Sequence, residues 1–114
     1  MCLLAKQRTK QALEKLAPFG DRAETLRMVS KEAAPRFTNG SLDFVHLDGS
    51  HEPPHVQWDI DLWWPKLHPG GVLAGHDFVC PGKPGREDDW GRYIQPVVIQ
   101  HAMNCGVDIN LVVE

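Results

Sequence analysis

The 114 residues suffice for one small domain, and an apolar fraction of 42% with a charged fraction of 24% is typical of a globular protein. A net charge of −3 without a long basic run excludes the electrostatic footprint of a nucleic-acid-binding protein, and no apolar stretch approaches the roughly 20 residues of a membrane span. Cys2, Cys80 and Cys105 show neither a disulfide framework nor metal-ligand spacing. We therefore expect a cytoplasmic protein in a reducing compartment.

The first forty residues predict two helices with a short strand between them. Residues 6–17 predict a mostly polar helix, and residues 23–29 predict the strand. Ser30 is a suitable N-cap for a second helix over residues 31–37. Asn39-Gly40 then predicts a turn.

The middle of the chain predicts a strand, an amphipathic helix and another strand. Residues 42–47 form a short, largely apolar run that is typical of a strand buried on both faces. Apolar residues then recur at helical spacing, namely Val56, Ile60, Trp63, Trp64 and Leu67. Pro69-Gly70-Gly71 is expected to break the chain before a strand over residues 72–75.

The last third predicts a loop, a helix and a final strand. Residues 80–89 are rich in Gly, Pro and charge, which is typical of a loop. A helix is expected to begin near Pro96 and to end at Gly106, and residues 107–113 predict a strand. Strands that alternate with helices predict parallel pairing and an α/β layer fold.

The segment His51-Glu52-Pro53-Pro54-His55 matches the H-E-x-x-H pattern of zinc proteases. That chemistry needs both histidines on one face of a regular helix, and two consecutive prolines between them forbid such a helix. Prolines are favoured where a helix begins. We therefore expect His51 to precede a helix and His55 to lie in its first turn, which excludes the protease interpretation.

Polar side chains follow two of the predicted strands. Asp48 follows the strand at 42–47, and His76 and Asp77 end the next one. Because ligands bind beyond the carboxyl ends of strands in open α/β sheets, these side chains can share one cation. Neighbours in a regular strand point to opposite faces, so His76 and Asp77 share a metal only where the strand has ended. The alternative is that one of them caps a turn or pairs with another side chain.

His51 is expected at the mouth of the same crevice, where a histidine can remove a proton from a substrate hydroxyl near neutral pH. The alternative is a surface histidine beside a helix start. The other four histidines are expected to be structural or solvated, and they are His46, His55, His68 and His101. Trp63 and Trp64 are expected in the core.

Three stretches, residues 42–51, 59–67 and 69–78, resemble in order and spacing the methyltransferase 24 family of class I methyltransferases. They are more distantly similar to catechol O-methyltransferase-like enzymes. Residues 17–22 and 30–34 also resemble the preceding part of that family. The resemblance runs from about residue 9 to about residue 80 and is weaker beyond.

The resemblance implies a Rossmann-like three-layer α/β methyltransferase fold and methyl transfer from S-adenosylmethionine to a hydroxyl oxygen of a small molecule or sugar. It implies cofactor contacts at Ser30 and Asp48. It also implies that His51 occupies the position of a general base, which is a lysine in the catechol enzymes.

Metal ligation is implied at Asp48, His76 and Asp77 by the metal-dependent members of the family. A histidine at position 76 departs from the all-oxygen ligand set that suits Mg²⁺. The resemblance therefore leaves open whether a divalent metal binds, and whether it is Mg²⁺ or a transition metal.

The family begins with a strand, a G-x-G turn that approaches the cofactor, and an acidic residue that holds the ribose, and these 114 residues contain none of the three. We therefore expect a partial methyltransferase domain over residues 1–114, without the first two strands and the last one. The chain alone is expected to be incomplete, and its unpaired strands are expected to lead to rearranged pairing, to association with another chain, including self-association, or to partial disorder. The alternatives are a non-catalytic interaction module of the same fold and a metal-dependent hydrolase that uses Asp48, His51, His76 and Asp77.

Overall fold

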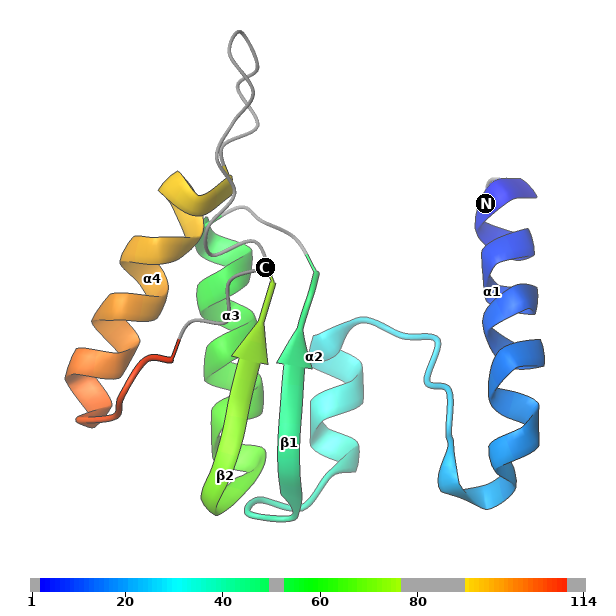
Figure 1. The fold of residues 1–114 in the computed structure, drawn as a ribbon, viewed down its shortest axis with the longest axis horizontal. Helices are drawn as coiled ribbons and strands as arrows, with labels where there is room; N and C mark the ends of the chain where they lie inside the picture. Colours follow the sequence, from blue (N-terminus) through cyan, green and yellow to red (C-terminus); the bar gives the residue numbers. More distant parts are fainter. Residues whose placement is uncertain (1–2, 50–52, 77–89, 111–114) are drawn as a thin grey trace, which may run out of the picture.

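The computed structural model describes residues 3–49, 53–76 and 90–110. Its elements in chain order are α1 (Leu3–Leu16), the 3-10 helix η1 (Ala17–Arg22), α2 (Ser30–Ala33), η2 (Ala34–Arg36), β1 (Leu42–Leu47), α3 (Pro53–Trp63), η3 (Trp64–Lys66), β2 (Leu67–Gly75) and α4 (Trp90–Cys105). The two strands lie side by side with α2, α3 and α4 around them, while α1 stands apart (Figure 1). Among the described residues, no helix has the length and apolar character needed to cross a membrane.

β1 and β2 are parallel neighbours joined through α3, which makes a βαβ unit. Phe44 lies beside Val72, and Leu47 lies beside Gly75. The expected strand at 42–47 is confirmed at both ends, as is its parallel pairing with the next strand. The α/β class follows from this unit.

β2 begins at Leu67, five residues earlier than expected, because Pro69-Gly70-Gly71 forms an irregularity within the strand and does not end it. Leu42 lies beside Leu67, whereas Phe44 already lies beside Val72, so the register shifts between them. Gly70 adopts φ +88°, which favours glycine. A Cβ on Gly71 would lie 3.0 Å from the carbonyl oxygen of His68 and 3.1 Å from that of Asp43. The glycines therefore let the chain bulge and continue.

α3 begins at Pro53, as expected from the tolerance of proline in a first helical turn. The helix carries His55 in this first turn, so the structure agrees with the exclusion of a zinc-protease helix. At its other end, Trp63 packs against Phe37 with a ring-centroid distance of 5.6 Å. Trp63 and Trp64 are half-buried, so the expectation that they lie in the core is only partly met.

The core is small and lies between the sheet and the helices. Its buried hydrophobic residues are Ala33, Ala34, Val45, Ile60, Ile94 and Ala102. They come from α2, η2, β1, α3 and α4, so these elements meet around one apolar centre.

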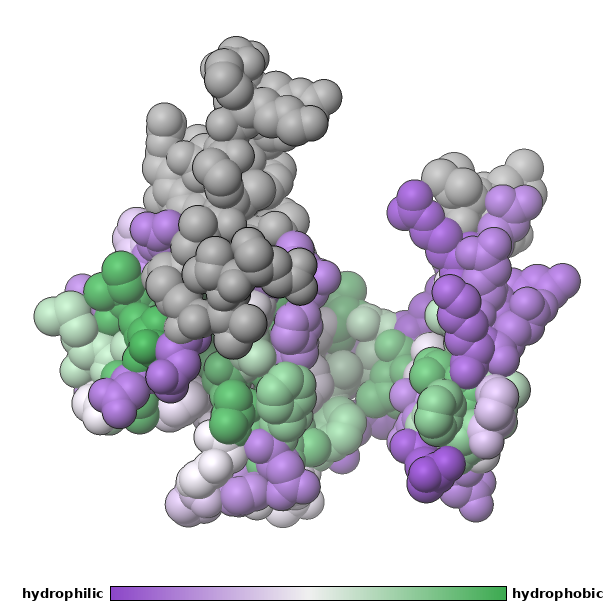
Figure 2. Space-filling view, viewed as in Figure 1, coloured by the Kyte–Doolittle hydropathy of each residue, from purple (hydrophilic) through white to green (hydrophobic). Residues whose placement is uncertain are grey.

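The opposite face of the sheet is open in the described structure. Phe44 and Val72, which lie side by side on it, are 59% and 53% exposed. Figure 2 shows hydrophobic side chains on the face of the strands that is turned to the viewer. The expectation that residues 42–47 are buried on both faces is therefore wrong for the described residues, because the described helices cover only one face.

Two of the expected strands are not formed where the structure describes them. Residues 23–29 are irregular, and residues 107–110 are irregular as well, while 111–114 lie outside the described residues. A strand needs a neighbour to complete its backbone hydrogen bonds. No such neighbour lies within the described residues for either segment.

Two helix boundaries also differ from expectation. Ser30 is the first residue of α2, and Val29 occupies the cap position without a side-chain hydrogen bond. α4 begins at Trp90, so Pro96 lies inside the helix and removes one backbone donor there. The end of α4 at Gly106 is confirmed, with φ +66° at that glycine and the amide of Val107 donating to the carbonyl of Ala102 at 3.1 Å.

Candidate functional site

Asp48 and His76 lie at the carboxyl ends of the two neighbouring strands. Asp48 directly follows β1, and His76 directly follows β2. The amide of His76 donates to the carbonyl of Leu47 at 3.3 Å, which extends the ladder one step past the strand. The structure thus brings these two predicted site residues to one edge of the sheet.

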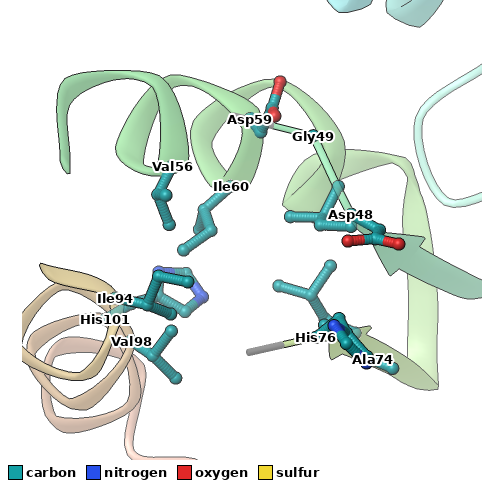
Figure 3. Close-up of a pocket in the computed structure, with 13 residues that line it drawn as sticks. Asp48, Gly49, Val56, Asp59, Ile60, Ala74, His76, Ile94, Val98 and His101 are labelled. Atoms are coloured by element: carbon teal, nitrogen blue, oxygen red, sulfur yellow. The ribbon is translucent and has the colours of Figure 1, made fainter. Parts of the chain in front are cut away.

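A cavity of about 110 Å³ lies between this edge, α3 and α4. Figure 3 shows Val56 and Ile60 of α3 pointing toward Ile94 and Val98 of α4 across it. The polar side chains in its lining are Asp48, Asp59, His76 and His101. The cavity is therefore an apolar hollow with polar groups from the strand ends and from both helices.

The connection after β1 passes close to α3. A Cβ on Gly49 would lie 3.2 Å from Oδ2 of Asp59, which is tighter than most real contacts. Glycine at this position therefore lets the strand end approach the helix. Asp59 was not among the predicted site residues. The sequence did contain a signal for it, because Asp59 is a polar residue on the same helix face as the apolar Val56 and Ile60.

His101 also lines the cavity, although a structural or solvated role was expected for it. Its ring meets the ring of Trp64 edge-on at a centroid distance of 4.6 Å, and Nε2 lies 3.8 Å from Sγ of Cys105. These contacts agree with a structural role. The position of the ring at the cavity adds a polar group that the sequence pattern did not indicate.

Ser30 is half-buried at the start of α2 and is not part of the cavity lining. His51 and Asp77 lie outside the described residues, so the general-base role and the separation of the Asp48 and Asp77 carboxylates stay predictions. Within the described ranges, no group of three or more His, Cys, Asp or Glu side chains is gathered for a metal. Asp77 lies outside these ranges, so metal ligation also stays a prediction.

The described residues do not fit a complete nucleoside cofactor. The cavity volume of about 110 Å³ is below the ~300–1,000 Å³ that is typical of small-molecule pockets. What the residues offer is one exposed carboxylate at Asp48, a close backbone approach at Gly49 and an adjoining apolar hollow. This is part of a ligand site at the carboxyl edge of a parallel sheet.

Comparison with known proteins identifies one family. The model of a family described as a methyltransferase domain matches residues 2–78. The uncharacterised protein y4gI of Sinorhizobium fredii (strain NBRC 101917 / NGR234) is 38% identical over 52 residues, which are 46% of this chain. The match covers 6% of that relative, so the chain corresponds to a small part of its length. No solved structure matches the chain.

Proposed function

This chain belongs to the methyltransferase 24 family of methyltransferase domains, and on that premise we propose that it supplies the later part of an S-adenosylmethionine-dependent methyltransferase domain. The acceptor in this proposal is a hydroxyl oxygen of a small molecule or sugar. The observation that carries the proposal is the placement of Asp48 and His76 at the carboxyl ends of two neighbouring parallel strands. Ligands of open α/β sheets bind at this edge.

The cofactor supplies a methyl group that is already activated on a sulfonium. The chain's own task is to position polar groups and to accept a proton. Asp48 is exposed, and its carboxyl oxygens can accept hydrogen bonds from hydroxyl groups. Orientation of the reacting groups supplies much of the rate in such a reaction.

We assign proton removal to His51. It stands three residues after Asp48 and two before α3, in the short connection between Gly49 and Pro53. An imidazole has the pKa for general-base chemistry near neutral pH. Assistance by a divalent metal at Asp48, His76 and Asp77 is a separate prediction, and the proposed role of His51 does not depend on it.

We further propose that the complete domain has three layers, with residues 1–114 forming only part of it. In the family strand order 3-2-1-4-5-7-6, which enters by resemblance, β1 and β2 correspond to the fourth and fifth strands. The exposed face at Phe44 and Val72 is the surface on which a further helical layer would pack. Among the described residues, β1 has a hydrogen-bonded neighbour on one side alone, which is β2.

The second candidate function is a non-catalytic interaction module of the same fold. The observation that favours it is the exposure of Phe44 and Val72 on one sheet face, since large exposed apolar groups often mark interaction sites. The small cavity also agrees with this candidate. The two functions differ in whether the strand-end site recognises the methyl donor.

Amide chemical-shift mapping of the purified chain with S-adenosylmethionine tests the site. We expect weak binding, with a dissociation constant of about 1 mM or weaker, and shifts concentrated at Asp48, Gly49 and His76. Asp48→Asn should reduce these shifts, whereas Asp21→Asn, an exposed carboxylate in η1, should leave them unchanged. If the amide signals at the strand ends do not shift at an S-adenosylmethionine concentration of about ten times this dissociation constant, the result would favour the interaction module.

A further inference from the structure

α1 and η1 form an arm that stands apart from the rest of the molecule (Figure 1). The element against which α1 packs is η1, which follows it in the chain. Leu13, Leu16 and Phe19 on this arm are 49%, 37% and 50% exposed. Figure 2 shows a hydrophobic patch at the η1 end of the arm. Within the described ranges, the arm therefore presents apolar side chains that no other part of the chain covers.

The arm is also basic, whereas the rest of the chain is acidic. The arm contains five basic side chains and two acidic ones. The chain has 12 Lys and Arg and 15 Asp and Glu, so taking away those of the arm leaves 7 basic and 13 acidic side chains. Opposite net charges on two parts of a chain favour contact between them.

Charge and apolar groups share one face of the arm. Lys10, Leu13 and Leu16 follow each other at a spacing of three, so they lie along one side of the helix. The open sheet face carries the exposed apolar side chains of Phe44 and Val72. The exposed His46 follows Phe44 on β1, and the exposed carboxylate of Asp48, which also lines the cavity, comes after the end of the strand. Leucines against Phe44 and Val72 would therefore bring a lysine toward Asp48.

We propose that the arm docks on the open face of β1 and β2 in a second copy of this chain, and that the exchange is reciprocal in a two-fold dimer. The extended segment 23–29 carries the arm away from its own sheet, so the face of another copy is the surface that it reaches without refolding. A reciprocal exchange uses both arms and both faces, which closes the assembly. The arm of the second copy would then occupy the face on which the further helical layer of the complete domain would pack. The proposal does not depend on methyl transfer.

Sedimentation velocity or light scattering measures the association of the full chain at protein concentrations from about 1 μM to 1 mM. We expect a concentration-dependent dimer that weakens as salt rises, because the contact pairs a basic arm with a chain whose remaining residues are net acidic. Leu13→Glu should weaken the dimer at least about tenfold, the effect of about 1.4 kcal/mol. Met103→Glu is the matched control, because Met103 is 71% exposed on α4, away from arm and face, and it should not change the dimer.

A mixing experiment separates arm exchange from other ways of association. Leu13→Glu disrupts the docking surface of the arm, and Val72→Glu disrupts the sheet face, so each variant alone should dimerise more weakly than the unchanged chain. A mixture of the two restores one intact arm and one intact face, and it should form heterodimers. Leu13→Glu should leave the sheet intact, since α1 stands apart from the strands (Figure 1). Circular dichroism checks that both variants keep their fold.

Three results would overturn the arm exchange. The first is a wild-type chain that stays monomeric over the whole range, which means that the arm folds back on its own sheet or stays free. The second is a dimer that Val72→Glu abolishes but Leu13→Glu leaves intact, which indicates contact between two sheet faces. The third is a mixture that associates no better than its two components.

Discussion

His68, the second residue of β2, contacts Asp43, the second residue of β1: its Nε2 lies 2.7 Å from Oδ1 of Asp43, and its Nδ1 lies 2.6 Å from the carbonyl oxygen of Pro69. Both partners are hydrogen-bond acceptors, so both ring nitrogens must carry a proton, and only the imidazolium form provides two donors. The hydrogen bond to the Pro69 carbonyl, followed by the contact with Asp43, raises the pKa of His68 above its usual 6.5.

This arrangement predicts a pH-dependent contribution to stability. Since the pKa of His68 is raised in the folded state, the contribution is fully present below the usual pKa of 6.5 and is lost as pH rises through the raised pKa. His68→Gln should therefore destabilise the chain more at about pH 5 than at about pH 9. Urea unfolding of both proteins at each pH measures this difference. An equal difference at the two pH values would contradict the charged pairing, as would an unchanged His68 titration in Asp43→Asn.

Gly71→Ala is expected to destabilise the fold by about 1–3 kcal/mol, the usual effect of an added methyl group in a filled space. The new Cβ would meet two backbone carbonyl oxygens, those of His68 and Asp43, at 3.0 and 3.1 Å. Gly75→Ala is the control, because its Cβ would meet the Leu47 carbonyl at an ordinary 3.4 Å. Urea unfolding measures the free energy of unfolding of both variants. Equal values for Gly71→Ala and Gly75→Ala would show that the bulge has room to relax.

His51→Ala should lower methyl transfer about 10²–10⁴-fold in a polypeptide that contains the complete family domain, the usual range for loss of a general base. Cofactor affinity should change little, since His51 is assigned to the proton of the acceptor. His55→Ala, in the first turn of α3, is the control, and its turnover should stay close to that of the unchanged protein. A turnover within a few-fold of the original across the pH range would make His51 a surface residue.

Asp48 and Asp77 are expected to face each other across the ends of β1 and β2, with carboxylates within about 10 Å, roughly two strand spacings. Paramagnetic Mn²⁺ titrated into the chain should then broaden the amide signals of Gly49 and His76 first. Asp48→Asn should abolish this selective broadening, and Asp21→Asn should not. An experimental structure with the carboxylates farther apart would rule out a shared cation.

The residues that could be predicted from the sequence are those whose surroundings lie nearby in the chain. The strand at 42–47 was predicted at its exact ends because a short apolar run stands between a turn at Asn39-Gly40 and a polar Asp48. The start of α3 at Pro53 and the end of α4 at Gly106 follow from local backbone preferences. The neighbouring positions of Asp48 and His76 then follow from parallel pairing.

What could not be predicted depends on distant partners. Residues 23–29 have a sequence suitable for a strand, yet a strand forms only beside another, and no neighbour stands there among the described residues. Pro96 predicts a helix start because proline is favoured there, but the six residues before it also belong to α4. Asp59 and His101 enter the cavity lining through the packing of α3 with α4, which no local pattern encodes.

Titration calorimetry of the purified chain with S-adenosylmethionine tests most directly whether these residues form only part of a cofactor site. The small cavity, the single exposed carboxylate at Asp48 and the absence of a G-x-G turn from the 114 residues predict no binding in the micromolar range. Micromolar one-to-one binding by a monomer would contradict this, because it would show that Ser30 and the Asp48 strand end suffice to hold the cofactor.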